Sequence, residues 1–318
     1  MADLNHGNTP LGEPKAPVAL FNDTLYREKT RWEKFKEGLG TLRRSRTGLA
    51  GMIIMIIVVF SAIFADFIAP YDPRQQTLSD RLIEPFNLDK GKNPHILGTD
   101  HLGRDMLSRL IYGSRVSLIV GITAVSISTA LGLFFGLISG YFSGWIDDLI
   151  MRIGDILLAF PFVLLVIAVV LVVGGGLKNE IIIIGLFGWV GGARVVRGQV
   201  LSVREKEFIE AARCIGVRTP VLLVRHIMPN VLTPIIVLST FSVASIIILE
   251  AGLTFLGLGV DPSVPTWGGM LSDGRSHIFT SWWMTVLPGM AIFFTVLAIN
   301  MLGDWLRDFL DPEVRNLM

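Results

Sequence analysis

Hydrophobic residues gather along this chain in six long runs separated by polar stretches. The runs cover residues 49–69, 114–139, 152–173, 180–196, 231–256 and 282–302. About 20 apolar residues, each adding about 1.5 Å to a helix, cross the hydrocarbon core of a bilayer. The fourth run is the shortest, but it still approaches this length. The pattern therefore predicts an all-α, polytopic membrane protein with six transmembrane helices.

Basic residues predict which way these helices run. Eight Lys and Arg residues lie between positions 27 and 46, just before the first run. An excess of Lys and Arg marks the cytoplasmic side of a membrane protein. The N-terminus is therefore expected in the cytoplasm, and six crossings return the C-terminus to the same side. The Arg-rich segment 197–229 also falls inside, while Trp282 and Trp283 suit the outer interface.

The predicted crossings divide the chain into five parts. They are the cytoplasmic tail 1–48, the first transmembrane helix 49–69, the external loop 70–113, the five-helix core 114–305 and the cytoplasmic tail 306–318. Within the first tail, residues 25–40 are expected to form a short amphipathic helix with Trp32, Phe35 and Leu39 on one face. Within the core, residues 197–229 are expected to form a cytoplasmic loop.

Composition agrees with a membrane protein and excludes several other classes. Hydrophobic residues make up 51% of the 318 residues and charged residues only 17%, whereas about a quarter of a soluble domain is charged. A net charge of +1 gives no support for nucleic-acid binding. Cys214 is the only cysteine, so the chain has no intramolecular disulfide.

The sequence carries no pattern typical of an enzyme. It has no Gly-rich phosphate loop followed by Lys and Ser or Thr, so we do not expect it to bind ATP itself. His95, His101, His226 and His277 are scattered, and no pair has metal-ligand spacing, so no metal site is expected. No Ser or Cys nucleophile has an evident base. These observations favour a transport subunit over an enzyme.

The cytoplasmic segment 197–229 has the pattern of two helices separated by a glycine. Residues 204–215 are good helix formers. Gly216 follows them, where a helix end uses the left-handed conformation that glycine adopts easily. Pro220 is placed to open a second helix in its first turn. We therefore predict a helix–Gly–helix unit in the cytoplasm.

The chemistry of this segment is suited to docking on another protein. Ala211 and Ala212 lack bulk, so a second surface can approach the backbone, and Glu210 can set the orientation of a partner. Burial of a large apolar side chain contributes about 1.5–3 kcal/mol. Four apolar side chains lie beside these residues: Phe208, Ile209, Ile215 and Val217. Residue pattern alone leaves a second interpretation open, in which the segment folds against its own membrane domain.

Several motifs resemble one transporter family. Glu210-Ala211-Ala212, Gly216 and the segment 227–229 resemble the Glu-Ala-Ala loop of ABC importer permeases, although Met228 stands where the family usually has Leu. Further segments resemble the second, C-type permease of the dipeptide, oligopeptide and nickel branch. They are 93–117, Arg152-Ile-Gly-Asp155 with Phe160-Pro161, 250–259, 265–268 and 303–312.

This resemblance implies a type I ABC importer permease in the bacterial cytoplasmic (inner) membrane. The implied partners are a second, B-type permease, two ATP-binding subunits and an external substrate-binding protein. ATP and Mg would be held by the ATP-binding subunits, and no cofactor by this chain. The Glu-Ala-Ala loop would form a coupling helix that inserts into an ATP-binding subunit. Short peptides are the implied substrates and nickel or a nickel chelate the alternative, while a stand-alone proton-coupled carrier is an alternative of another class.

Charged residues within or next to the runs are further candidates. Glu250 lies inside the fifth run, where a carboxylate is costly, so it either lines the translocation path or acts as a structural pivot. Arg152 with Asp155, and Asp304 with Arg307, are expected at inner helix ends, where they can reach water and pair. An alternative is that they transmit motion from the ATPases.

Glycines in the fourth run predict close packing of neighbouring helices. They are Gly185, Gly188, Gly191 and Gly192.

Overall fold

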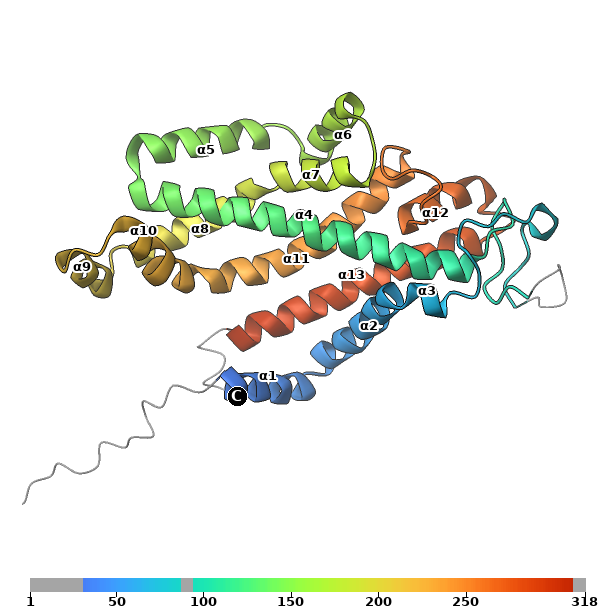
Figure 1. Cartoon of the computed structure of the whole chain (residues 1–318), viewed down its shortest axis with the longest axis horizontal. Helices are drawn as coiled ribbons and strands as arrows, with labels where there is room; N and C mark the ends of the chain where they lie inside the picture. Colours follow the sequence, from blue (N-terminus) through green and yellow to red (C-terminus); the bar gives the residue numbers. More distant parts are fainter. Residues whose placement is uncertain (1–30, 87–93, 311–318) are drawn as a thin grey trace, which may run out of the picture. The chain divides into compact units, whose positions relative to one another are not determined.

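The computed structural model describes residues 31–86 and 94–310, which fold into helices joined by loops (Figure 1). The chain divides into two units, Met1–Thr41 and Leu42–Met318. Helix α1 (Arg31–Arg44) begins in the first unit and covers the described part of the amphipathic helix predicted at 25–40. Residues 25–30 lie outside the described residues.

The second unit consists of helices of very different lengths. In chain order they are α2 (Arg46–Ile63), α3 (Ala65–Ile68), η1 (Leu78–Asp80), α4 (Met106–Phe142), α5 (Gly144–Leu158), α6 (Phe162–Val173), α7 (Leu177–Phe187), α8 (Trp189–Val203), α9 (Glu207–Cys214), α10 (Thr219–Val221), the π-helical η2 (Leu222–Ile227), α11 (Met228–Phe255), α12 (Trp267–Gly274), η3 (Arg275–His277) and α13 (Trp283–Leu310). Within the described ranges the only β-type pairing is an isolated bridge between Thr99 and Asp105.

Five helical segments are long and apolar enough to cross a membrane, and the bent pair α5–α6 would make a sixth. The five are Arg46–Ile63, Met106–Phe142, Leu177–Val203, Thr219–Phe255 and Trp283–Leu310. This confirms the predicted all-α, multi-span fold.

The third predicted span, 152–173, is not a straight helix. Helices α5 and α6 meet at an angle of 84°. The break falls at Pro161, which has no N–H to donate within a helix and which disfavours helical backbone at the preceding Phe160. Hydropathy runs through this point without a gap, so the pattern of apolar residues alone hides the bend.

Two helices extend past the predicted apolar runs. Helix α4 begins at Met106, eight residues before the predicted run at 114, so its first turns lie within the segment predicted as the external loop 70–113. Asp105 caps this helix by accepting a hydrogen bond from the Ser108 backbone N–H at 2.8 Å. At the other end of the core, α13 continues to Leu310, past the predicted boundary at 305.

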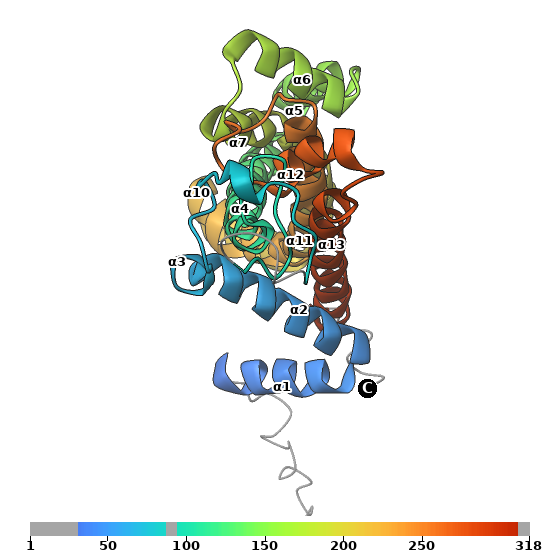
Figure 2. The ribbon, with the colours of Figure 1, turned by 90° about the vertical axis from the view of Figure 1, so that its right-hand side faces the viewer.

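Helix α4 lies at the centre of the second unit, with α5, α7 and α8 on one side and α2, α11 and α13 around the rest (Figures 1 and 2). Its closest neighbour is α8. Gly132, Gly136 and Gly140 recur every four residues on one face of α4, and a Cβ on Gly136 would lie 2.6 Å from Cβ of Val196. Of the glycines predicted to pack in the fourth run, Gly185 and Gly188 also lie close to α4, whereas a Cβ on Gly191 would meet nothing within 4 Å.

The two ends of the second unit carry different elements. Helices α9 and α10 lie at one end, and α12 with the loop 94–105 lies at the other (Figure 1). Arg204, just after α8, donates to the Gly140 carbonyl oxygen at 3.0 Å and to Ser143 Oγ at 2.5 Å. These bonds fasten the start of the predicted coupling segment to the junction of α4 and α5.

Candidate coupling surface and buried polar sites

The segment between α8 and α11 contains the predicted helix–Gly–helix unit. Helix α9 ends at Cys214, and Gly216 follows with a φ of +78°. The Gly216 N–H donates to the Arg213 carbonyl at 2.9 Å and the Val217 N–H to the Ala212 carbonyl at 3.1 Å, which closes the helix end. Pro220 lies in the first turn of α10, and the chain continues through η2 into α11.

Burial separates the predicted contact residues of α9 into two faces. Ile209 and Ala212 are buried in a cluster with apolar residues of η2 and α11, including Leu222, Ile227 and Val231. Val217 packs against the same cluster. Contrary to the prediction, Ile209 and Ala212 are therefore not free to dock on a partner. An amphipathic helix turns its apolar stripe towards its own core, and these positions form that stripe.

The opposite face of α9 stays open. Phe208 and Ile215 are 46% and 82% exposed, and Glu210, Ala211 and Gly216 are exposed as well. The Arg213 guanidinium lies 5.3 Å from the centre of the Tyr141 ring on α4, and this contact helps hold α9 in place. The two interpretations of the segment thus each describe one face: the inner face is anchored and the outer face is available.

Two ion pairs join α5 to α8. Asp155 pairs with Arg194 at 2.5 Å and not with the predicted Arg152, which is exposed and makes no ion pair with a described residue. Asp147 accepts two hydrogen bonds from Arg197, at 2.6 and 2.5 Å. This second pair was not predicted from the sequence, because its acid and its base lie on different helices and only the packing of α5 on α8 brings them together.

The other predicted inner pair is absent. Asp304 and Arg307 on α13 are both exposed, and neither makes an ion pair with a described residue. Residues three apart on a helix can pair, but exposed pairs gain little because both charges are well hydrated.

Glu250 lies in the interior of the helical core. Its side chain is fully buried and accepts hydrogen bonds from Thr254 Oγ1 at 3.1 Å and Ser117 Oγ at 3.3 Å. Glu180 at the start of α7 is also buried, and neither of its carboxyl oxygens has a hydrogen-bond partner among the described residues. Glu180 was not among the residues predicted from the sequence. The burial of Glu250 favours a pivot between α4 and α11 over a position on an open path.

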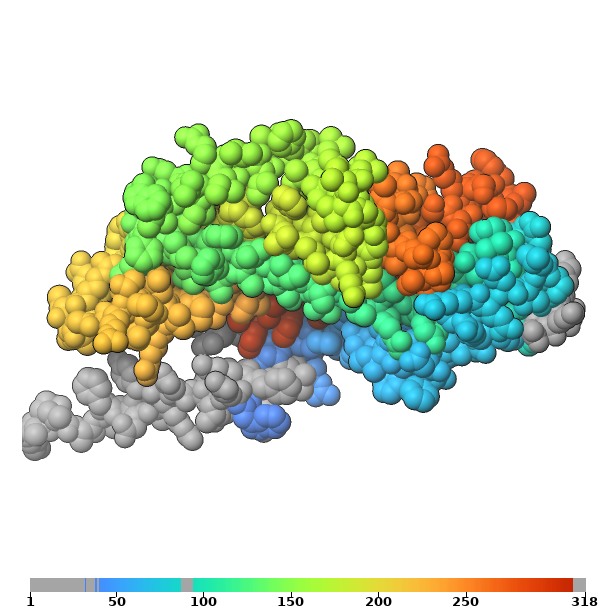
Figure 3. All heavy atoms as spheres, turned by 45° about the horizontal axis from the view of Figure 1, so that its top comes forward, coloured from blue at the N-terminus to red at the C-terminus, as the bar shows by residue number. Residues whose placement is uncertain are grey.

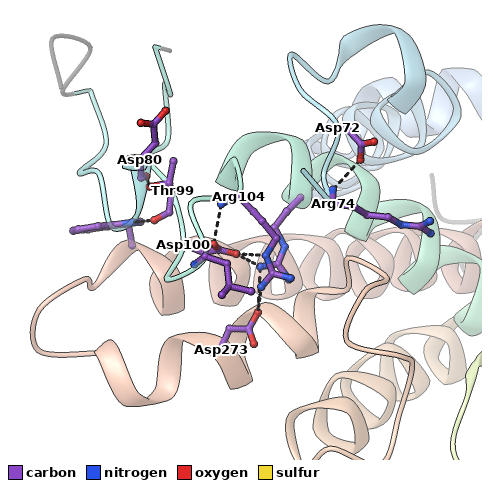
Figure 4. Close-up of polar contacts among 10 residues, drawn as sticks. Asp72, Arg74, Asp80, Thr99, Asp100, Arg104 and Asp273 are labelled. Atoms are coloured by element: carbon purple, nitrogen blue, oxygen red, sulfur yellow. Dashed lines mark hydrogen bonds and ion pairs between the residues drawn. The ribbon is translucent and has the colours of Figure 1, made fainter. Parts of the chain in front are cut away.

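A network of buried charges lies at the opposite end from α9 (Figure 4). Asp100 accepts hydrogen bonds from Arg104 Nε at 2.6 Å and from Arg109 Nη1. Asp273 on α12 accepts from Arg104 at 2.9 Å and from Arg109 at 3.1 Å. Burial would raise the pKa of Asp100, but the guanidiniums of Arg109 and Arg104 hold it below its ordinary value. The network therefore ties the start of α4 to α12.

Two histidines meet next to this network. The rings of His101 and His277 stack with their centres 5.7 Å apart, although 176 positions in the sequence (101 to 277) separate them. Ligand atoms of Asp100, His101 and Asp273 lie within 4.8 Å of one another. Both carboxylates already pair with two guanidiniums, whose positive charge opposes binding of a cation. The site acts as a structural clamp between α4 and α12.

Comparison with known proteins places these features in a family. Residues 132–316 match the family described as "binding-protein-dependent transport system inner membrane component". Residues 34–85 match the family described as "N-terminal TM domain of oligopeptide transport permease C". The first match covers the whole of α9 and both ion pairs between α5 and α8, and the second covers α2 and α3.

Several curated proteins are similar over nearly the whole chain. The di/tripeptide transport system permease protein DppC of Pseudomonas aeruginosa (strain UCBPP-PA14) is 41% identical over 285 residues, which cover 90% of this chain and 92% of that protein. The glutathione transport system permease protein GsiD of Escherichia coli O6:K15:H31 is 42% identical over 288 residues, with the same coverage. GsiD of Shigella dysenteriae serotype 1 has the same identity and coverage.

Proposed function

Since this chain belongs to the family of binding-protein-dependent inner-membrane transport components, and is an ABC importer permease of the peptide or glutathione type, we propose that it carries di- and tripeptides inward. The relatives named above carry di/tripeptides or glutathione. Glutathione is itself a tripeptide, so these substrates share free ammonium and carboxylate groups on a short backbone. A short zwitterionic peptide is the substrate class that both names support.

The observation that carries the driving mechanism is the two-faced helix α9. Its inner face is anchored by Ile209 and Ala212, and its outer face presents Phe208, Glu210 and Ile215. We propose that this outer face docks on an ATP-binding subunit in the cytoplasm. Apolar side chains would supply affinity, and Glu210 would fix the orientation.

The anchoring of α9 supports a route by which motion reaches the membrane. Ile209 and Ala212 share one apolar cluster with residues of α4, α8 and α11, and Arg204 holds the junction of α4 and α5. When two ATP-binding subunits close on ATP and Mg, α9 moves with them. The packed helices then follow as a body, because a close-packed core transmits displacement. The complete importer has a second permease and an external binding protein.

A stand-alone proton-coupled carrier is the less supported alternative. It requires a relay of intramembrane acids, and among the described residues only two glutamates, Glu180 and Glu250, are buried. An exposed apolar face on a cytoplasmic helix has no role in such a carrier. Family membership and α9 both favour a partner ATPase.

The proposal is tested by uptake into proteoliposomes that contain both permeases, both ATP-binding subunits and the external binding protein. Wild-type complex is expected to take up a labelled dipeptide, a tripeptide or glutathione when ATP is supplied. Uptake of nickel and of no peptide would overturn the substrate class. Uptake without any ATP-binding subunit would overturn the driving mechanism.

Two variants of α9 test its coupling role. Gly216→Asp places a side chain on a left-handed backbone, and Glu210→Lys reverses the exposed charge. Each is expected to lower transport per ATP hydrolysed at least tenfold while the permease stays in the membrane. Asp308→Lys, an exposed charge reversal on α13 outside this face, serves as the control. Normal coupling in both α9 variants would contradict the proposal.

A further inference from the structure

The ion pair Asp155–Arg194 lies in the inner half of the membrane-spanning part of the protein. The segment Leu177–Val203 has 27 residues, which is about 40 Å of helix. Arg194 precedes its end, Val203, by nine residues, or about 14 Å along the helix axis. The segment extends past a hydrocarbon core of about 30 Å, so this position lies in the inner part of the apolar layer, on the side of the cytoplasmic interface.

The two side chains are nevertheless open to their surroundings. Arg194 is 48% exposed and Asp155 is 52% exposed. The surrounding surface of α5 carries Ile153 and Ile156, which are both exposed, and also the exposed Arg152. Figure 3 shows α5 and α6, drawn in green, standing on this face of the second unit. Charged side chains in this layer face a water-filled cavity or other protein, or reach the aqueous interface, and do not face lipid tails.

The neighbouring pair shows what a purely structural bridge looks like here. Arg197 and Asp147 make two parallel hydrogen bonds, and the Asp147 side chain is only 9% exposed. Arg194 and Asp155 share a single hydrogen bond, from Arg194 Nη2 to Asp155 Oδ1. One carboxylate oxygen and most of the guanidinium donors therefore have no partner among the described residues, so the pair has capacity to bind a ligand.

The α8 surface beside Arg194 leaves room for that ligand. Gly191 and Gly198 stand about one turn before and after Arg194, and both are exposed. A Cβ added to either would meet no atom within 4 Å. A ligand backbone can therefore approach the helix on either side of the guanidinium.

We propose that Asp155 and Arg194 form a transient binding site on the translocation path for the charged termini of a short peptide. This inference rests on the proposed peptide-import function. Arg194 binds the carboxylate through its planar guanidinium, and Asp155 accepts hydrogen bonds from the ammonium group. Charge complementarity selects this occupant, because a zwitterionic peptide supplies both opposite charges on one short backbone. When no peptide is bound, Arg194 and Asp155 pair with each other.

Transport by the complete importer in proteoliposomes provides the first test. Arg194→Gln and Asp155→Asn are expected to lower the maximum rate of dipeptide uptake about tenfold. The KM should change less than twofold, because capture by the external binding protein precedes this step. Arg194→Lys keeps the charge and should recover part of the rate. Unchanged maximum rates in both neutral variants, or loss of assembled complex with no recovery by Arg194→Lys, would overturn the site.

Cysteine accessibility provides the second test. It distinguishes a translocation path from an interface with the second permease. In a Cys214→Ser background, Gly191→Cys and Gly198→Cys are each treated with a charged, membrane-impermeant thiol reagent. Val196→Cys, a fully buried position of the same helix, is the control. We expect labelling at both glycine positions, at a rate that differs between nucleotide-free and ATP-bound complex and falls with excess dipeptide.

Other outcomes overturn the site in distinguishable ways. Disulfide cross-linking to the second permease without labelling would make this face a subunit interface. Labelling only by a lipid-soluble maleimide would make it a lipid contact. If wild-type complex carries no peptide, the proposed function itself fails. Peptide uptake by the wild type combined with unlabelled cysteines rejects this site alone.

Discussion

Asp100 is the residue on which the network of buried charges next to α12 depends most. It is fully buried and pairs with both Arg104 and Arg109, whereas the Asp273 side chain is 28% exposed. Asp100→Asn leaves two buried guanidiniums with a single carboxylate, and removing one partner of a buried pair costs about 3–5 kcal/mol. We expect a lower unfolding temperature for the detergent-purified complex. Asp273→Asn is the matched control. It should lower the unfolding temperature less, since water can hydrate the partly exposed side chain.

The pH dependence of stability provides a check on this prediction. The pKa of Asp100 in the folded protein lies below its ordinary value of 3.8, so the charged form stabilises the fold. This stabilisation is fully present above the ordinary value and is lost as pH falls through the lower folded-state pKa. The difference in unfolding temperature between wild type and Asp100→Asn should therefore persist from pH 7 to pH 5 and shrink below pH 4. A difference that grows towards low pH would contradict this account.

Among the helices, the contact of α4 with α8 depends on glycine spacing. A Cβ on Gly136 would lie 2.6 Å from Cβ of Val196 and 2.7 Å from the Ala193 carbonyl oxygen. Because backbone is involved, the two helices must separate, and such overpacking costs about 1–3 kcal/mol. Gly136→Ala is expected to lower the unfolding temperature and the yield of assembled complex.

A glycine in open surroundings gives the control for this change. Gly252 lies within α11, and a Cβ there would meet nothing within 4 Å. Gly252→Ala should be neutral or slightly stabilising, because alanine favours a helix over glycine by about 1 kcal/mol. Equal losses in the two variants would show that helix separation is not the cause.

The helices themselves were predictable to different degrees. Hydropathy identified each membrane segment because a long apolar run is a local property of the chain. The bend at Pro161 and the cap at Asp105 also depend on local residues. They were not predicted, because Pro161 lies within a continuous apolar run and Asp105 within a polar stretch. The partner of Asp155 was not predictable, since Arg194 lies on another helix and only the packing of α5 on α8 selects it.

The two faces of α9 show the same limit. Its residues predicted an amphipathic helix that ends at Gly216, and this helix is present. Local sequence could not decide whether Ile209 or Phe208 would face the core. That choice depends on the cluster formed with Leu222 and Ile227, which exists only after the chain folds back.

At the scale of the whole molecule, α9 and the network of buried charges lie at opposite ends of the second unit (Figures 1 and 4). The end that carries α12 is held by Asp100, Arg109 and Asp273, and the end that carries α9 is held by apolar packing of that helix. In the proposed importer, the first end faces the binding protein and the second faces the ATPases. This arrangement depends on the predicted orientation, with both termini in the cytoplasm.

Cys214 provides a direct test of this orientation, since it is the only cysteine of the chain and is exposed at the end of α9. A membrane-impermeant maleimide is expected to label it in inside-out vesicles and not in right-side-out vesicles. Phe279→Cys in a Cys214→Ser background is the control. Phe279 is fully exposed beside α12 and should label with the opposite preference.

The same thiol reports on docking, because the exposed face of α9 becomes buried when an ATP-binding subunit covers it. Assembly with the ATP-binding subunits should slow labelling of Cys214 at least tenfold, and Glu210→Lys should restore much of the rate. Labelling of Cys214 in right-side-out vesicles would contradict the proposed topology. A rate that is unaffected by the ATP-binding subunits would instead place their docking surface elsewhere, because a covered thiol cannot react at the rate of a free one.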